Sequence, residues 1–348
     1  MMAFRKGIVY LHIGTEKTGT TSLQHCIYSN KKVLLEKYQT YYPSTPGQQN
    51  HTDLALYTYE DKLGDLPLRK GLSSAEELAE FKEKFEKDFL REVAPYIKMG
   101  YNLLLSNEHL SSRGGRELAP KQKLIKLFTD LGMKVKVVVY LRPQEEFMAS
   151  TYSTRIKSGG TDDFDPLAYK KKRYDYLGML DNWASVVGSD NIHLGIFQPK
   201  RWKDKNLYLD FFAKIGIAPN SDLTFPERAR NKSFSQEQIE FLRQFNGLVP
   251  EYLDGAKNEL RGDVIEYLES LPTSEPFSLD QKLILEIQKY YKKDNEKLRK
   301  TYLSELDSLF EYKKSEKADK GIEPLSSHNI FAHLWKQQQA RINELSGH

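Results

Sequence analysis

Four short apolar runs alternate with segments of helical periodicity in the first part of the chain. The runs are residues 7–13 (GIVYLHI), 102–106 (NLLLS), 136–141 (KVVVYL) and 192–197 (IHLGIF). Short apolar runs that contain β-branched and aromatic residues are typical of buried strands. Strands that are apolar along their whole length belong to sheets that are covered on both faces. We therefore expect these four segments to lie in one parallel sheet.

Helical patterns lie between the apolar runs. Ser74 and Glu77 form the sequence of a capping box, and apolar residues follow them at helical spacing. Further helices are predicted over residues 121–131, 143–157 and 204–215, with Pro143 at the first helical position. Strands that alternate with helices predict an α/β fold with helices on both faces of the sheet. Ligands bind such sheets at the carboxyl ends of the strands, so the residues directly after each strand are the candidates for a site.

The remainder of the chain has a different pattern. From about residue 234 it is polar and helical, with no clear strand. We expect one domain over residues 1–311, with an α/β core of about 6–235 and a helical extension of about 236–311. Residues 312–348 hold a charged linker and then an amphipathic helix over 328–345. Its apolar face needs a partner surface, which is either its own domain, a second copy of the chain or another chain.

Residues 14–22 (GTEKTGTTS) follow the first predicted strand and open a helix. Gly14 and Gly19 have the spacing of an NTP-binding loop, but Thr20 follows the second glycine where that loop has lysine. The lysine, Lys17, lies inside the loop instead. Free N–H groups at the start of a helix bind anions, and Lys17 with the Thr20, Thr21 and Ser22 hydroxyls adds further donors. The loop therefore predicts a P-loop-like fold with an anion site, and a simple helix cap is the alternative.

A kinase of the P-loop class would also need an acidic residue after a second strand to hold Mg²⁺. Arg142 follows one predicted strand and Gln198 lies at the end of another, whereas Glu108 is the one acid of this kind. A sulfuryl group carries less charge than a phosphoryl group, so lysine and backbone donors suffice for its transfer. We therefore favour a transfer that needs no metal, and an NTP-dependent kinase is the alternative.

Two motifs resemble those of a known family. Residues 16–24 (EKTGTTSLQ) resemble the 5′-phosphosulfate loop of sulfotransferases, which use 3′-phosphoadenosine 5′-phosphosulfate (PAPS), and are most similar to the bacterial, carbohydrate-type branch. In residues 141–150 (LRPQEEFMAS), Arg142 and Ser150 match the family's 3′-phosphate motif, and residues 228–235 look like a later cofactor loop. The cofactor-binding residues that the resemblance implies are Lys17, Thr18, Gly19, Thr20, Thr21, Ser22, Arg142, Ser150, Arg230, Asn231, Lys232 and Ser233.

Sulfuryl transfer to a hydroxyl or amine needs a general base, and the segment after strand 102–106 offers Glu108 and His109. The resemblance favours Glu108, because a glutamate commonly serves in the carbohydrate-type branch and a histidine in the steroid and phenol type. His109 is the alternative, since adjacent side chains point in different directions and do not serve together. Lys17 would stabilise the leaving phosphate oxygen.

Three further residues are candidates for the reaction or for the acceptor. His12, at the end of the first strand, is either a catalytic residue or a buried structural histidine. His51 lies in a loop rich in aromatic and amide residues, which suits a sugar acceptor. Arg155 would line the path of an anionic acceptor, and a solvated helix face explains it equally well.

Composition limits the class of protein. The 348 residues are 39% hydrophobic and 29% charged with a net charge of +4, which is typical of a soluble protein and does not indicate nucleic acid. The single cysteine, Cys26, excludes an intramolecular disulfide. No apolar stretch is long enough to span a membrane, so we expect a cytoplasmic enzyme that acts on a small-molecule or glycan acceptor. A non-catalytic protein that binds the product PAP on the same fold is a further alternative.

Overall fold

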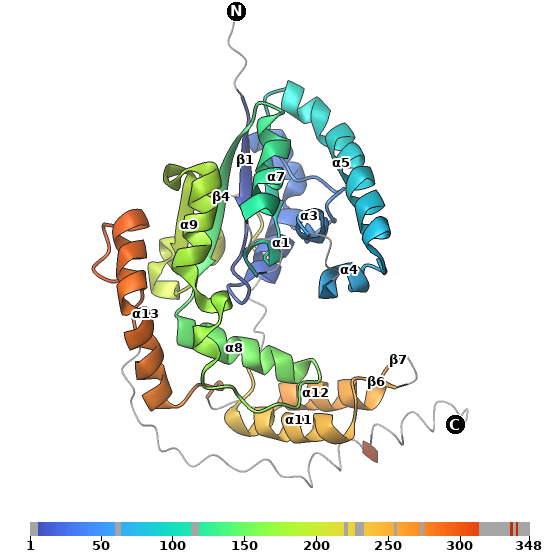
Figure 1. The fold of residues 1–348 in the computed structure, drawn as a ribbon, viewed down its shortest axis with the longest axis vertical. Helices are drawn as coiled ribbons and strands as arrows, with labels where there is room; N and C mark the ends of the chain where they lie inside the picture. Colours follow the sequence, from blue (N-terminus) through green and yellow to red (C-terminus); the bar gives the residue numbers. More distant parts are fainter. Residues whose placement is uncertain are drawn as a thin grey trace, which may run out of the picture. The chain divides into compact units, whose positions relative to one another are not determined.

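The computed structural model describes most of the chain as two compact units (Figure 1). The described residues are 6–59, 64–112, 118–218, 222–226, 233–253, 256–271, 275–312, 335–336 and 339. Unit 1 takes its described residues from 1–142, 172–229 and 291–311, and unit 2 from 143–171, 230–290 and 312–348. The predicted loop, Glu108, His109 and Arg142 therefore belong to unit 1.

Unit 1 is built on a five-stranded parallel sheet with the order β2-β3-β1-β4-β5. The strands are β1 (Ile8–His12), β2 (Thr40–Tyr41), β3 (Asn102–Ser106), β4 (Lys134–Leu141) and β5 (Ile192–Ile196). In register, His12 lies beside Ser106 on one side and Val138 on the other. The predicted α/β fold with a parallel sheet is confirmed, and the loop after β1 leaves from the middle of the sheet.

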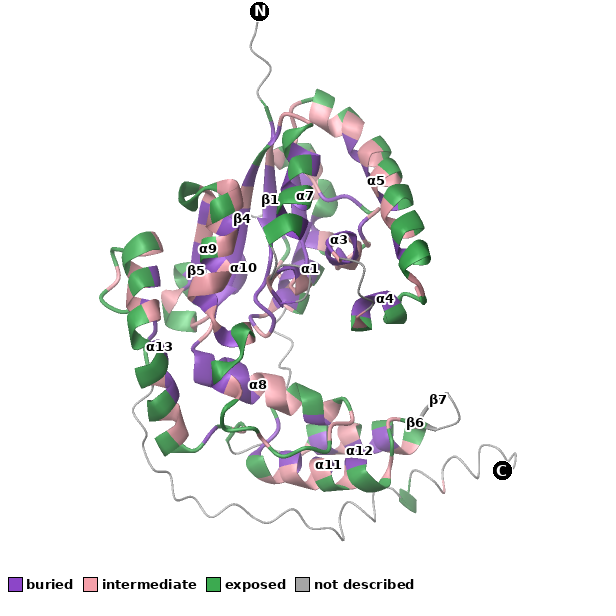
Figure 2. Cartoon of the chain, viewed as in Figure 1, coloured by how far each residue is buried: buried purple, intermediate pink, exposed green. Residues whose placement is uncertain are grey.

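Helices cover both faces of this sheet because successive strand residues point to opposite sides. On one face, Tyr10 and Tyr140 pack with Leu23 and Ile27 of α1 (Thr20–Ser29) and with Phe211 of α10 (Leu207–Lys214). The other face is covered by α7 (Leu118–Thr129) and α9 (Tyr176–Val187), which contact each other and β4 (Figures 1 and 2). The remaining α-helices that lie wholly in unit 1 are α2 (Lys31–Tyr38), α3 (Thr52–Tyr57), α4 (Asp65–Arg69), α5 (Ala75–Lys98) and α6 (His109–Ser112).

Unit 2 is mainly helical and has its own core. Its elements are α8 (Gln144–Lys157), α11 (Gln236–Leu248), β6 (Tyr252–Leu253), β7 (Ala256–Lys257), α12 (Glu259–Ser270) and the first part of α13 (Gln281–Tyr302). Apolar side chains of α8, α11 and α12, among them Ile156, Leu242 and Val264, form the core. The short antiparallel pair β6–β7 corrects the expectation of no strand in this region, since two-residue strands are too short to give a sequence period.

Several element boundaries differ from those that the sequence predicts. Pro143 precedes α8 rather than opening it, with an extended ψ of 131°. The helix predicted over 204–215 begins only at Leu207, because the Asn206 side chain caps it. Ser74 caps α5, but the Glu77 carboxylate accepts from Ser73 instead of closing a capping box.

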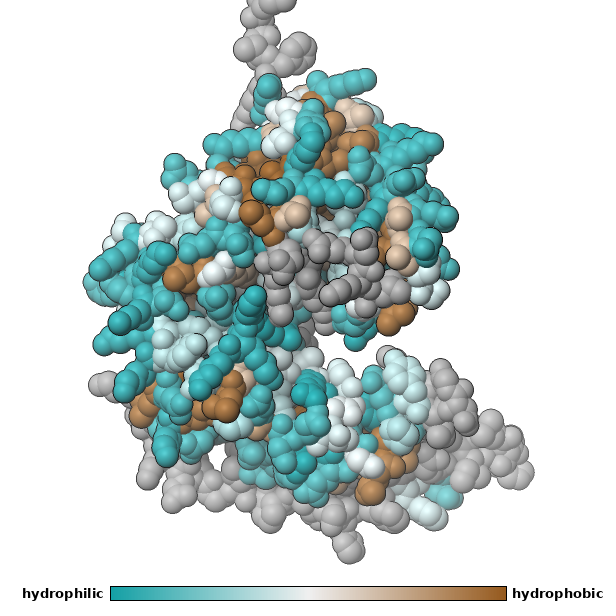
Figure 3. Space-filling view, in the orientation of Figure 1, coloured by the Kyte–Doolittle hydropathy of each residue, from teal (hydrophilic) through white to brown (hydrophobic). Residues whose placement is uncertain are grey.

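Two observations concern the surface and the end of the chain. Hydrophilic side chains predominate on the face shown in Figure 3. No helix in the described ranges is both long and apolar enough to cross a membrane. The helix predicted over 328–345 lies outside the described residues, apart from Trp335, Lys336 and Gln339.

Candidate functional site

The loop between β1 and α1 has an unusual backbone. Gly14 and Gly19 have φ values of 103° and 74°, and Lys17 has a φ of 64°. A residue with a side chain pays about 1–2 kcal/mol for this left-handed conformation, so neighbouring contacts must impose it. Contacts with β4 hold the start of the loop: Thr15 donates its N–H (3.0 Å) and Oγ1 (3.1 Å) to the Tyr140 carbonyl. Tyr140 in turn donates its N–H to the Gly14 carbonyl at 2.7 Å.

The start of α1 presents the N–H groups of its first turn. Gly19 is the N-cap residue, and no side chain of the described residues caps the helix. The Thr18 hydroxyl donates to the Thr15 carbonyl at 2.6 Å, so it stabilises the loop from within. Thr20 is buried, Thr21 is exposed and Ser22 is half-buried. With Lys17 at intermediate exposure nearby, this helix end has the donors that a phosphate or sulfate group requires.

Glu16 fixes the loop to two other segments of unit 1. Its side chain is 90% buried, and Oε1 accepts from His109 Nδ1 (3.2 Å) and from Ser112 Oγ (3.0 Å). Oε2 accepts from the guanidinium of Arg173, in the 3₁₀ turn Lys172–Tyr174. These three donors to one buried carboxylate fix Glu16, the residue before Lys17, in its place.

Glu108 lies against the loop from the neighbouring strand end. A Cβ placed on Gly14 would lie 3.1 Å from the Glu108 Cα, so the loop backbone passes directly beside Glu108. Gln24 Nε2 donates to Glu108 Oε2 at 2.8 Å. Asn50 Nδ2 approaches Oε1 and Oε2 only at 3.4 and 3.5 Å, the long limit of a hydrogen bond. Within the described ranges, Oε2 is therefore held firmly and Oε1 is left largely available.

Glu108 and His109 have different surroundings, as expected for adjacent residues. The His109 ring is bound to Glu16, whereas the Glu108 carboxylate is surrounded by amides. The buried Asn107 between β3 and α6 supports this arrangement, because its Oδ1 accepts from the His109 N–H (3.0 Å) and its Nδ2 donates to Asn50 Oδ1 (2.6 Å).

His12 is completely buried beside the loop. Its Nδ1 lies 2.8 Å from Ser106 Oγ, and the rings of Tyr140 and Phe211 meet it edge-on. Burial lowers the pKa of His12 to about 4, and the backbone of Gly14 offsets this only in part. His12 is thus a neutral imidazole at physiological pH, and its role in the reaction stays a prediction.

His51 is also completely buried. It accepts from the Ser106 N–H at 3.1 Å and donates its own backbone N–H to the Ser106 carbonyl at 3.0 Å. The ring of Tyr42 covers it, with 4.2 Å between the ring centroids. Burial lowers the pKa of His51 to about 3. The His51 side chain is thus buried, and acceptor binding by this residue stays a prediction.

Arg142, the residue after β4, lies at the other side of the loop. Its Nη1 donates to the Lys17 carbonyl at 3.4 Å, and its guanidinium lies 5.9 Å from the centre of the Phe197 ring. A Cβ on Gly19 would lie 3.0 Å from the Phe197 ring and 2.9 Å from the Leu207 side chain. A larger residue here would therefore displace either these side chains or the start of α1. Unit 1 therefore brings Lys17, the helix start and Arg142 together.

The other predicted residues belong to unit 2 or lie outside the described residues. Ser150 and Arg155 lie on α8 in unit 2, where Arg155 forms an exposed ion pair with Asp162. Ser233 is exposed in unit 2. Arg230, Asn231 and Lys232 lie outside the described residues.

Sequence reasoning missed the amides that surround Glu108 and the partners of Glu16. Gln24 offered one signal, because it interrupts the apolar face that Leu23, Cys26 and Ile27 form on α1. Asn50 and Arg173 offered none, since they reach the site from distant parts of the chain.

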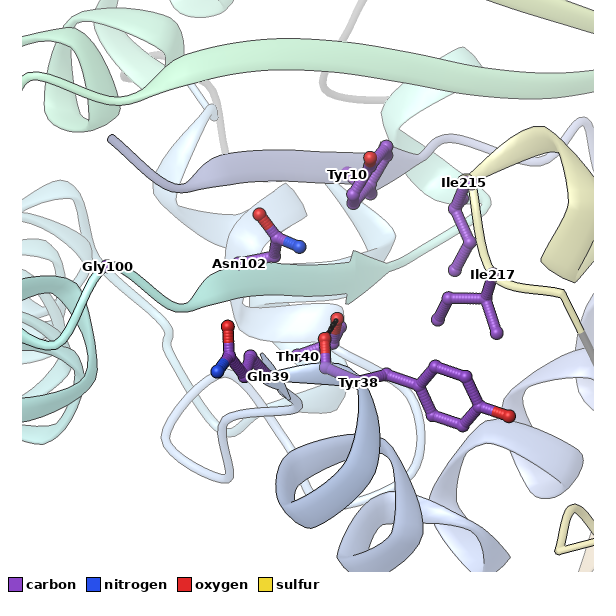
Figure 4. A pocket seen from close by; sticks show the side chains of 9 residues that line it. Tyr10, Tyr38, Gln39, Thr40, Gly100, Asn102, Ile215 and Ile217 are labelled. Carbon is purple, nitrogen blue, oxygen red and sulfur yellow. Dashed lines mark hydrogen bonds between the residues drawn. The ribbon is translucent and has the colours of Figure 1, made fainter. Parts of the chain in front are cut away.

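A cavity of about 210 Å³ lies elsewhere in unit 1, at the amino ends of β2 and β3 (Figure 4). Its lining residues are Tyr10, Tyr38, Gln39, Thr40, Gly100, Asn102, Ile215, Gly216 and Ile217. None of them belongs to the predicted site, which lies at the opposite, carboxyl ends of the strands.

Comparisons with known proteins leave the family open. No family model matches the chain. An uncharacterized protein of Archaeoglobus fulgidus is 27% identical over 187 residues, which are 52% of this chain. The match covers 49% of that protein, so the chain spans about half the length of the curated relative that it matches.

The solved structures that resemble the chain include two sulfotransferases. A sulfotransferase from Alicyclobacillus acidocaldarius is 14% identical over 69% of this chain and 91% of that one, with a TM-score of 0.40. A sulfotransferase domain from the curacin biosynthetic pathway is 12% identical over 82% of this chain and 97% of that one, with a TM-score of 0.34. A structure of the PezAT toxin–antitoxin system of Streptococcus pneumoniae is 13% identical over 70% of this chain and 86% of that one, with a TM-score of 0.29. Likenesses of this size decide neither the family nor the function.

Proposed function

We propose that the chain is a PAPS-dependent sulfotransferase that moves a sulfuryl group to a hydroxyl or amino group. A carbohydrate or glycolipid is the favoured acceptor, from the likeness of residues 16–24 to the carbohydrate-type branch. The observation that carries the proposal is the approach of Glu108 to Gly14, with 3.1 Å from its Cα to a Cβ placed there. Among the described residues, the one contact of Glu108 Oε1 is the long one from Asn50, so a carboxylate that can accept a proton adjoins the loop.

The residues present suit the phosphosulfate group of PAPS. The first-turn N–H groups of α1 and the Lys17 ammonium are the donors of the loop, and the Glu16 carboxylate beside them is bound to His109 and Arg173. Arg142 would bind the 3′-phosphate, because a guanidinium grips phosphate through two donors. The resemblance also implies Ser150 as a cofactor-binding residue. PAPS supplies the activated sulfuryl group.

Each group then has a defined part in the transfer. Glu108 Oε1 takes the proton of the acceptor hydroxyl as the acceptor oxygen bonds to sulfur. Bound PAPS would supply the sulfuryl group, with the 5′-phosphate oxygen as the leaving group that keeps the electron pair. Lys17 and the first-turn N–H groups stabilise the charge that develops there. His109 is less suited as the base, because Glu16 holds its ring.

A thermal shift titration tests the cofactor class. A ligand that binds only the folded state stabilises it by about 2.7 kcal/mol at a hundredfold excess over its dissociation constant. We expect PAP to raise the melting temperature and ATP with Mg²⁺ to leave it unchanged. A rise with ATP and Mg²⁺ alone would overturn the proposal in favour of a kinase. PAP binding without any release of PAP from PAPS would instead indicate the non-catalytic alternative.

A further inference from the structure

Gln24 occupies an unexpected place on α1. It is 2% exposed and lies between Leu23, Cys26 and Ile27, which all belong to the buried core. A buried amide lowers stability unless its polar atoms are bonded. Both bonds of its Nε2 go to the strand end beside the loop: one to Glu108 Oε2 at 2.8 Å and one to Ser106 Oγ at 3.3 Å. The side chain therefore connects the phosphate-binding helix with the carboxylate of Glu108.

We propose that Gln24 is the positioning residue of the general base, an inference that rests on the proposed function. Its N–H fixes Oε2 of Glu108, and the carboxylate then turns Oε1 towards the acceptor. Gln24 lies one helical turn after Thr20, so one rigid element holds both the phosphosulfate donors and the base. Gln24 thus links these donors to the base through one side chain.

The chemistry of the amide suits this task better than a charged group. An N–H donor stabilises the ionised form of a carboxylate without adding charge to the site. The second N–H of the same nitrogen is held by Ser106, whose hydroxyl contacts the buried, neutral His12. The hydrogen bond to Ser106 therefore fixes the orientation of the Gln24 amide, and the amide orients the Glu108 carboxylate before an acceptor binds.

Two substitutions of Gln24 separate positioning from folding. Gln24→Met removes the N–H donor at similar volume, and Gln24→Glu places a second carboxylate against Glu108. His25→Ala is the matched control, because His25 is exposed on the same helix. Each variant is compared with wild type by the PAP-induced rise in melting temperature and by PAP release from PAPS. Octyl β-galactoside, octyl β-glucoside and water alone serve as acceptors, from pH 5 to 9.

We expect Gln24→Met to retain the PAP-induced rise and to lose about 10- to 100-fold in rate, the effect of a misplaced reacting group. We expect Gln24→Glu to move the acid limb of its pH–rate profile upward by about one unit or more, because two neighbouring carboxylates share a proton. Activity of this variant then recovers at high pH. A merely structural role would lower the rate equally at all pH values.

The outcomes distinguish the two claims. The role of Gln24 would be overturned if the wild type is active, both variants react at the wild-type rate and the acid limb of the pH–rate profile does not move. This result would leave the proposed sulfotransferase function standing. Loss of the PAP-induced rise in Gln24→Met would also overturn it, by assigning Gln24 to the loop. A wild type that neither binds PAP nor releases it from PAPS would overturn the proposed function, and the inference with it.

Discussion

Glu108 and His109 show how neighbouring residues acquire different chemistry. One carboxylate oxygen of Glu108 is held by an amide and the other is available, whereas the His109 ring is engaged with Glu16. The sequence predicted that only one of the two would serve, because adjacent side chains diverge. It did not predict the amides, since Gln24 and Asn50 come from separate segments and their approach depends on the completed sheet.

The first prediction concerns the base itself. Glu108→Gln keeps the shape and the neutral hydrogen bonds of the side chain but cannot accept a proton. We expect it to retain PAP affinity and to lose about 10²- to 10⁴-fold in the rate of PAP release, the usual contribution of a general base. His109→Gln serves as the comparison, since its amide can still donate to Glu16. A larger loss in His109→Gln than in Glu108→Gln would contradict the assignment.

At the scale of elements, the loop after β1 is shaped by contacts with its neighbours. Two of its residues are held by β4, and Glu16 is bound to α6 and to the turn Lys172–Tyr174. The left-handed backbone at Lys17 is thus imposed from several sides. If the loop binds PAPS as proposed, loss of a partner of Glu16 should weaken PAP binding.

Arg173→Met tests the anchoring of the loop. It removes one of the donors of a buried carboxylate, so we expect the free energy of unfolding to fall by about 1–3 kcal/mol. We also expect weaker PAP binding, because the residue before Lys17 loses a support. Urea unfolding and PAP titration measure the two effects. Lys172→Met, a change at the exposed neighbour, is the control, and equal behaviour of the two variants would contradict this role.

The main strands were predictable because each is a continuous apolar run that a buried parallel sheet requires. β3 has the predicted bounds. β1 is one residue shorter at each end, β4 begins two residues earlier and β5 ends one residue earlier than predicted. β2 was not predicted, since its two residues, Thr40 and Tyr41, carry no periodic signal. The start of α10 was misplaced because capping by Asn206 outweighed the helical pattern before it.

At the scale of the whole molecule, the α/β class follows from the alternation of strands and helices, but the order of strands does not. The sequence pattern predicts that Glu108 and Arg142 lie at strand ends. It does not predict that β3 and β4 are the two neighbours of β1. Residues 230–232 and most of 328–345 lie outside the described residues, so those predictions stay open.

Two buried histidines predict how the stability of the protein depends on pH. Burial lowers the pKa of His12 to about 4 and that of His51 to about 3, from an unfolded value of 6.5. Below that unfolded value the unfolded chain binds protons that the native protein does not, so stability falls as the pH falls. Each histidine should cost about 2 kcal/mol between pH 7 and pH 5.

Urea unfolding at pH 7, 6 and 5 checks this dependence. His51→Asn should reduce the slope between pH 6 and 5, even if it lowers stability at pH 7. An unchanged slope in this variant would show that His51 is not the group responsible.

The central position of β1 has a consequence for how such a protein diversifies. The groups that would hold the donor follow β1 and β4, whereas the group that would activate the acceptor follows β3, on the opposite flank of the loop. Variation at the Glu108 side chain would thus alter reactivity towards the acceptor, while Arg142, the proposed phosphate ligand, follows a different strand. Such diversification has to keep the hydrogen bond from Gln24 on α1 to Glu108, because this bond links the segments that follow β1 and β3.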